Sequence, residues 1–133
     1  MREIKFRAWH VNRNRFIDFG LMIRPNGRVY STVKDEIWDD FTDEVEVTQY
    51  TGLDDVHGVE IYEGDIVNVT WQRDDVEGKN YVIAYNPNND GYPAFELVDW
   101  YEDVNGLSCA YIDGQITVIG NRFENLELLE AAE

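Results

Sequence analysis

Three side chains have the chemistry that nucleophilic catalysis or zinc binding would require: Cys109, His10 and His57. A catalytic cysteine or serine needs an adjacent base, and a zinc site needs several cysteines and histidines at close spacing. Both histidines fall in predicted turns, whereas Cys109 falls in a predicted strand, where it is interpreted as a small core residue. We therefore expect neither a Cys–His dyad nor a zinc site. A single cysteine also forms no internal disulfide, which fits a reducing cytoplasm.

Acidic side chains are abundant, but none has the spacing of a known ion site. Asn86 to Gly91 resembles the start of a calcium loop with glycine sixth, yet the twelfth position is Leu97 and the nearest carboxylate is Glu96. This segment is interpreted as a polar turn. A second acidic cluster is interpreted as a solvated face: Asp35, Glu36, Asp39, Asp40, Asp43 and Glu44. A hydrolase that uses two carboxylates is kept as a low-ranking alternative, and we expect no metal, no cofactor and no enzymatic activity.

Aromatic residues make up 14% of the chain, which is high for 133 residues. Most of them are expected to lie in the core or in cross-strand pairs. Tyr92, Trp100 and Tyr101 flank predicted loops, so they are the candidates for an exposed protein interface.

The segment from Gln49 to Val69 organises the rest of the chain. Gly52 follows a predicted strand and adopts positive φ without steric cost, and the residues from Asp54 to Gly58 are rich in turn formers. A second break precedes the β-branched strand Ile66–Trp71, a pattern found in small SH3-like barrels. Five residues are predicted to shape this segment structurally: Gly52, Gly58, Tyr62, Gly64 and Asp65.

Three parts of the chain together resemble the YopX family of small phage and prophage proteins. They are Met1–Trp9 at the start, Gln49–Leu53 with Tyr62–Val67 in the middle, and Val118–Asn121 with Glu124–Asn125 and Glu127–Leu129 near the end. One departure is Leu126, where the family usually has proline. The resemblance implies a fold and a phage or prophage context, and it implies no reaction mechanism.

The net charge of −16 is unevenly distributed along the chain. Met1 to Arg28 carries seven basic against two acidic side chains, which is +5, whereas the rest carries four against twenty-five, which is −21. An acidic surface repels phosphate, so direct nucleic-acid binding is not expected. The same charge supports an alternative function, in which the chain mimics DNA and inhibits a host DNA-binding protein.

Alternation of apolar and polar residues predicts a series of short strands. The predicted strands are Glu3–Trp9, Arg15–Phe19, Arg28–Val33, Glu44–Tyr50, Val59–Ile61, Ile66–Trp71, Asn80–Tyr85, Ala94–Trp100, Cys109–Ile112 and Gln115–Ile119. Pro25-Asn26-Gly27 is a strong turn signal, and the two strands that flank Asp113-Gly114 are predicted to form a hairpin. The segment Lys34–Thr42 is left open between a short helix, a loop and a strand.

The C-terminal end changes to helical periodicity. Asn121 and Glu124 have the spacing of a capping box, and a helix is predicted for Phe123–Glu130. Glu102–Ser108 is predicted to be a loop. No apolar run approaches the roughly 20 residues that span a bilayer, and the N-terminus lacks an apolar signal core.

The resulting prediction is one domain, residues 1–133, of mainly β structure. It consists of antiparallel hairpins with a partly open SH3-like barrel and a short C-terminal helix. The predicted function is a non-enzymatic phage or prophage accessory protein that binds a phage or host protein in the bacterial cytoplasm. A homo-oligomer is kept as one possible assembly, and no membrane association is expected.

Overall fold

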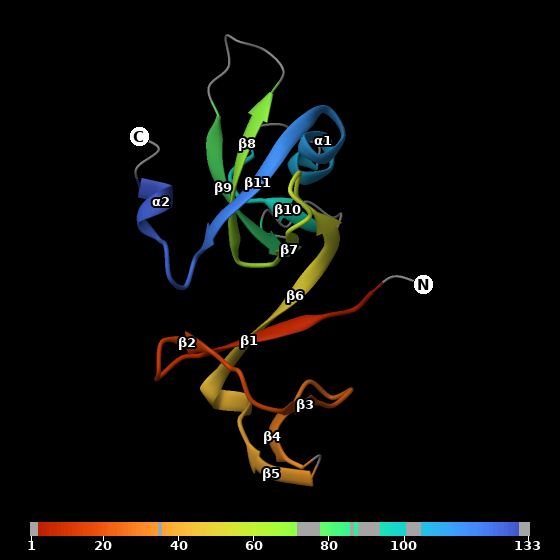
Figure 1. Cartoon of the computed structure of the whole chain (residues 1–133), viewed down its shortest axis with the longest axis vertical. Coiled ribbons are helices and arrows are strands. Elements are labelled where there is room, and N and C mark those ends of the chain that lie inside the picture. The colour runs from red at the N-terminus through yellow and green to blue at the C-terminus, as the bar shows by residue number, and fades with distance from the viewer. Residues whose placement is uncertain are drawn as a thin grey trace. The chain divides into compact units, whose positions relative to one another are not determined.

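The computed structural model describes residues 3–34, 36–71, 78–85, 87, 94–100 and 105–130. The chain divides into two compact units (Figure 1). The N-terminal unit consists of residues 6–48, and the C-terminal unit consists of residues 1–5 and 49–133. The expectation of one domain over residues 1–133 stays a prediction.

A four-stranded antiparallel sheet forms the centre of the C-terminal unit. Its order is β10-β9-β8-β11, from Phe95–Leu97, Lys79–Tyr85, Asp65–Trp71 and Gly114–Asn121. The central strands β8 and β9, both predicted from the sequence, pair antiparallel with Val67 opposite Tyr81. On the other side of β8, Val69 lies opposite Ile116. Because β8 has a neighbour on each edge, its β-branched residues can be buried in the middle of the sheet.

The core lies inside this unit. Its members are aliphatic side chains that are almost completely buried: Ile61, Val67, Val69, Ile83, Leu97, Leu107, Ala110 and Ile116. The rings of Trp71, Tyr81 and Trp100 are half-buried and pack against this cluster. The sheet around this core forms a half-barrel, and its antiparallel strand pairing confirms the predicted mainly β fold.

The N-terminal unit is built from short strands around two tight turns. β1 (Phe6–His10) pairs with β2 (Arg15–Phe16), and β4 (Val29–Val33) lies between β3 (Leu21–Ile23) and β5 (Glu36–Asp40). The predicted turn before β4 has Gly27 at φ 85°, with its N–H donating to Arg24 O at 2.8 Å. A short 3₁₀ turn, Thr42–Glu44, then leads into β6 (Val45–Asp54).

Within the open segment Lys34–Thr42, residues Glu36–Asp40 form the strand β5. β5 pairs with β4, and the Ser31 hydroxyl accepts a hydrogen bond from Asp39 N at 3.1 Å. Lys34 at φ 51° makes the turn between the two strands. The helical alternative depended on the spacing of Val33, Ile37, Trp38 and Phe41. Val33, Ile37 and Trp38 are exposed, so this spacing does not mark a buried helical face.

The strand before the central turn is longer than predicted. β6 continues through Thr51-Gly52-Leu53 to Asp54 and then pairs with β7 (Glu60–Tyr62). The register shifts between Tyr50 and Asp54, and Gly52 lies within this stretch at φ 89°. Glycine at positive φ lets a strand continue past an irregularity of this kind.

The prediction of a hairpin at Asp113-Gly114 is wrong. Cys109–Ile112 lies in helix α1 (Gly106–Asp113), so part of the predicted Glu102–Ser108 loop is also helical. Asn105 caps this helix, since its Oδ1 accepts from Ser108 N at 3.0 Å. Leu107 and Ala110, three residues apart, are both buried, so a helical face packs on the core. Gln115–Ile119 is a strand as predicted, within β11.

The short C-terminal helix is confirmed, but it is shorter than predicted. It is α2 (Glu127–Glu130), whereas the capping-box residues close a turn before it. Asn121 Oδ1 accepts from Phe123 N and Glu124 N, and its Nδ2 donates to Glu124 Oε1 at 3.0 Å. The predicted strands Arg15–Phe19 and Ala94–Trp100 are likewise shorter, as β2 and β10.

Candidate functional site

Asp55 holds the turn that follows β6. Its Oδ1 accepts from His57 N at 2.8 Å and Val59 N at 2.9 Å, while its Oδ2 accepts from Val118 N at 2.9 Å. The side chain thus connects the turn to β11. Asp55 is buried, with an exposed fraction of 8%. A buried carboxylate with three N–H donors is stabilised in its ionised form.

The pKa of Asp55 reflects two opposing effects. Burial raises it, but the backbone N–H groups of Val118, Val59 and His57 outweigh burial, so the pKa lies below its ordinary value. Asp55 therefore carries a fixed negative charge inside the turn.

The tip of this turn presents apolar side chains to solvent. Gly58 has φ 81° and donates from its N–H to Asp55 O at 3.0 Å, and Asp55 N donates to Val59 O at 2.8 Å. These bonds close the turn and leave Val56 and Val59 exposed at its surface.

A second turn joins β7 to β8. Asp65 is buried, and its Oδ2 accepts from Tyr62 N at 2.8 Å. Gly64 has φ 90°, and its N–H donates to Ile83 O at 2.7 Å. The ring of Tyr62 lies 5.6 Å from the ring of Tyr50. Of the five residues predicted to shape the central segment, Gly52 lies in β6, and Gly58 and Gly64 lie in these two turns. Tyr62 ends β7 and Asp65 begins β8, so they flank the second turn.

A pocket of about 400 Å³ lies beside the first turn. It is lined by residues of β6, the turn, the end of α1 and β11: Asp54, Asp55, Val56, Tyr111, Gly114 and Ile116. The hydroxyl of Tyr50 donates to Asp54 Oδ1. That hydrogen bond is the main reason why the pKa of Tyr50 rises to about 12. Local sequence patterns do not indicate this pocket, because they predict a strand at Tyr111, whereas Tyr111 lies in the helix α1 that brings it beside the turn.

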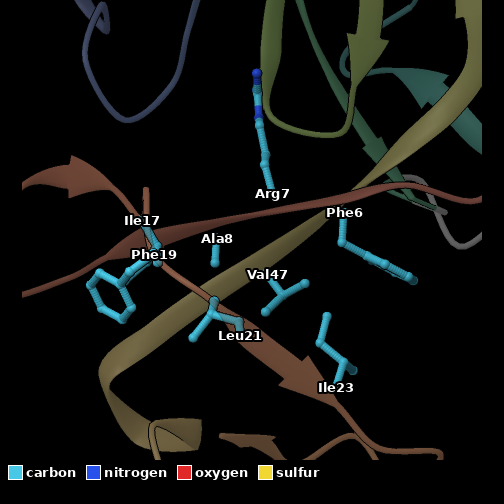
Figure 2. A pocket seen from close by; sticks show the side chains of 8 residues that line it. All are labelled: Phe6, Arg7, Ala8, Ile17, Phe19, Leu21, Ile23 and Val47. Carbon is cyan, nitrogen blue, oxygen red and sulfur yellow. The ribbon is translucent and has the colours of Figure 1, made fainter. Parts of the chain in front are cut away.

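A second, larger depression lies within the N-terminal unit and has a volume of about 470 Å³. Figure 2 shows its lining, which we call the apolar groove: Phe6, Arg7, Ala8, Ile17, Phe19, Leu21, Ile23 and Val47. The side chain of Arg7 extends away from the apolar residues in this view. Phe6 and Ala8 lie on one face of β1 because residues two apart in a strand share a face.

The structure describes one of the three aromatic residues that the sequence suggested for an interface. Trp100 is half-buried, with its ring 6.0 Å from Trp71 and 5.5 Å from Tyr81. Tyr92 and Tyr101 lie outside the described residues. Trp38 on β5 is instead 70% exposed. The use of Tyr92, Trp100 and Tyr101 at an interface stays a prediction.

The histidines and the cysteine occupy separate settings. His10 ends β1, is buried, and its Nδ1 accepts from Arg13 N at 3.3 Å. His57 lies in the turn held by Asp55, and Cys109 is half-buried in α1. In the described ranges no group of three or more His, Cys, Asp or Glu is placed to hold a metal ion.

The structure describes only part of the two segments that were considered as ion sites. Asp40 binds Thr42 and Arg28, and these hydrogen bonds lower its pKa to about 2. Asp35 and most of the Asn86–Gly91 segment lie outside the described residues.

Over the residues that the structure describes, the fold is therefore mainly β, with antiparallel sheets, a half-barrel core and two short α-helices. Residues 5–130 match the YopX protein family, so the chain belongs to that family. Among solved structures, it is similar to the crystal structure of protein EF1440 from Enterococcus faecalis. The TM-score is 0.62 at 24% identity, over 97% of this chain and 99% of that one.

No curated protein matches the chain. Within the described ranges, no helix has the length and apolar character needed to cross a membrane.

Proposed function

We propose that this YopX-family protein is a non-enzymatic accessory protein of a phage or prophage that binds a phage or host protein. The observation that carries the proposal is the apolar groove of the N-terminal unit. The resemblance to the family supports the phage or prophage setting, and the groove supports the binding of a protein partner.

The groove leaves apolar side chains exposed in a unit of 43 residues. Phe6 is 48% exposed, and Phe19 and Ile23 are also exposed. Burial of such side chains contributes roughly 25 cal/mol per Å² of apolar surface removed from water. The groove therefore suits an apolar segment of a protein partner. Truncation of Phe6 or Phe19 is expected to cost the most binding free energy.

The test is a comparison of captured partners from bacterial lysate with tagged wild-type protein and the Phe6→Ser variant. Phe6 is half exposed, so its replacement is expected to leave the fold intact by circular dichroism. We expect the variant to retain at most one-tenth of the partner that wild type retains.

The matched control is Trp38→Ser, which removes a more exposed aromatic of the same unit that does not line the groove. This control should retain the partner at the wild-type level. Equal losses in both variants would contradict a role for the groove. Light scattering of the eluate would identify self-association as the alternative occupant.

A second function, mimicry of DNA, is favoured by the charge of the C-terminal unit. That unit carries five basic against nineteen acidic side chains, a net charge of −14. A mimic must compete with duplex DNA for a basic host protein, and its affinity must fall as salt rises. Retention of the captured protein in the presence of excess duplex DNA would argue against mimicry.

A further inference from the structure

The pocket beside the Asp55 turn combines three kinds of group that recognise an organic cation. Asp54 supplies a carboxylate, Tyr111 supplies an aromatic ring, and Val56 and Ile116 supply aliphatic walls. Tyr111 is about half exposed, so its ring is accessible from solvent. A cation near an aromatic face and a carboxylate gains from both contacts.

The carboxylate of Asp54 is only partly used by its own chain. Its Oδ1 accepts from the Tyr50 hydroxyl, whereas Oδ2 has no hydrogen-bond partner within the part of the chain that the structure describes. Asp55, the other acid of the lining, is fully occupied by three backbone N–H donors and adds a fixed negative charge. Asp54 is therefore the group that is available to a ligand.

The described cations of the C-terminal unit lie outside the lining of the pocket. Lys5 binds Glu3 and Glu60. The guanidinium of Arg122 lies 4.2 Å from the ring of Phe123. Lys79 belongs to β9, and none of the described lysines and arginines lines the pocket. The net charge of −14 on this unit adds a long-range attraction for a positive ligand.

We infer that this pocket binds the guanidinium group of an arginine side chain presented by a protein partner. Asp54 Oδ2 accepts from the guanidinium, and the ring of Tyr111 stacks on its plane. Arginine fits better than lysine because its planar group stacks on aromatics and presents several donors in a fixed geometry. This site lies in a different unit from the apolar groove, so the inference is tested separately from the proposed function.

The test is a titration of the ¹⁵N-labelled full chain, followed by amide chemical shifts. The probe is the blocked tripeptide acetyl-Gly-Arg-Gly-amide, beside the same peptide with lysine or citrulline in place of arginine. We expect shifts concentrated at Asp54, Val56, Tyr111 and Gly114, with arginine at least threefold tighter than lysine and no saturable binding of citrulline.

Two substitutions distinguish binding in the pocket from non-specific electrostatic attraction to the acidic surface. Asp54→Asn should weaken binding at least fivefold, yet its amide oxygen still accepts from the Tyr50 hydroxyl, so the fold should persist. Tyr111→Leu should also weaken binding, because it removes the ring and keeps an apolar side chain. The matched control is Glu127→Gln on α2, which removes one exposed negative charge outside the pocket and should change the affinity less than twofold.

Three outcomes would overturn the inference. Equal weakening by Asp54→Asn and Glu127→Gln, or shifts spread over the acidic surface, would show non-specific attraction only. Tighter binding of free arginine than of the blocked tripeptide would show a site for the amino acid and not for a protein side chain.

Discussion

At the scale of single residues, the Asp55 carboxylate links the turn after β6 to strand β11. It satisfies the backbone N–H groups of His57, Val59 and Val118. Removing one partner of a buried hydrogen bond costs about 1–3 kcal/mol, because the remaining buried group has no hydrogen-bond partner from the protein or from water.

We predict that Asp55→Asn lowers the free energy of unfolding by about 1–3 kcal/mol. The asparagine carbonyl still accepts hydrogen bonds, but its amide donor replaces an acceptor and opposes a backbone donor. Urea denaturation followed by fluorescence measures the change. Asp113→Asn, at the exposed end of α1, should be nearly neutral. Equal effects of the two substitutions would contradict the role given to Asp55.

The same residue predicts a pH dependence. The folded pKa of Asp55 lies below its ordinary value, which is about 3.9 when unfolded. Between the two values the unfolded state binds more protons, so stability rises with pH there. The difference in the free energy of unfolding between wild type and Asp55→Asn should therefore be largest above about pH 5 and shrink as pH falls below about 4. A difference that stays constant down to pH 2 would contradict this prediction.

At the scale of elements, the β7–β8 turn depends on Gly64. Its φ of 90° is unfavourable for a side chain, and a Cβ would lie 3.3 Å from Arg122 Nε and 3.4 Å from Phe123 Cε2. Left-handed backbone alone costs roughly 1–2 kcal/mol for other residues. Gly58 has a similar φ of 81°, but a Cβ there meets nothing within 4 Å.

We predict that Gly64→Val is more destabilising than Gly58→Val, because only the first adds close contacts to the backbone strain. Thermal denaturation of both variants measures the difference. A Gly64→Val protein that kept wild-type stability would contradict the structural role of this turn.

Helix α1 supplies the second prediction at this scale. A Cβ at Gly106 would lie 2.4 Å from Trp100 Cδ2, so the indole or the helix must move. Overpacking of this kind costs about 1–3 kcal/mol, more than the gain in helix propensity of about 1 kcal/mol or less.

We therefore predict that Gly106→Ala lowers the melting temperature and changes the near-ultraviolet circular dichroism of the Trp71–Trp100 pair. Ser108→Ala, an exposed position of the same helix, is the control and should leave both signals unchanged. A stabilised Gly106→Ala protein would mean that Trp100 does not pack on Gly106.

At the scale of the whole molecule, stability is expected to differ between the two units. The buried aliphatic cluster lies in the C-terminal unit, whereas the 43 residues of the N-terminal unit expose several apolar side chains. Regions with little burial open more readily than a packed core.

We predict that hydrogen exchange of the full chain is slowest in β8 and β11 and faster in β3 and β5. The protection of Val67, Val69 and Ile116 should approach the free energy of global unfolding. Equal protection in β5 and β8 would contradict two units of unequal stability.

The positions of most strands, the Pro25-Asn26-Gly27 turn and the acidic balance followed from the sequence alone. They depend on local periodicity and on φ preferences, which a short segment carries by itself. Family membership was also readable from motifs at both ends and in the middle of the chain.

Tertiary structure alone decided the places where local patterns were ambiguous. Cys109–Ile112 has strand-like composition, but Leu107 and Ala110 bury a helical face against the core. Val33, Ile37, Trp38 and Phe41 have helical spacing, but Glu36–Asp40 instead pairs with β4 as a strand. The Asp54–Tyr111 pocket joins residues far apart in sequence, and only folding brings such groups together.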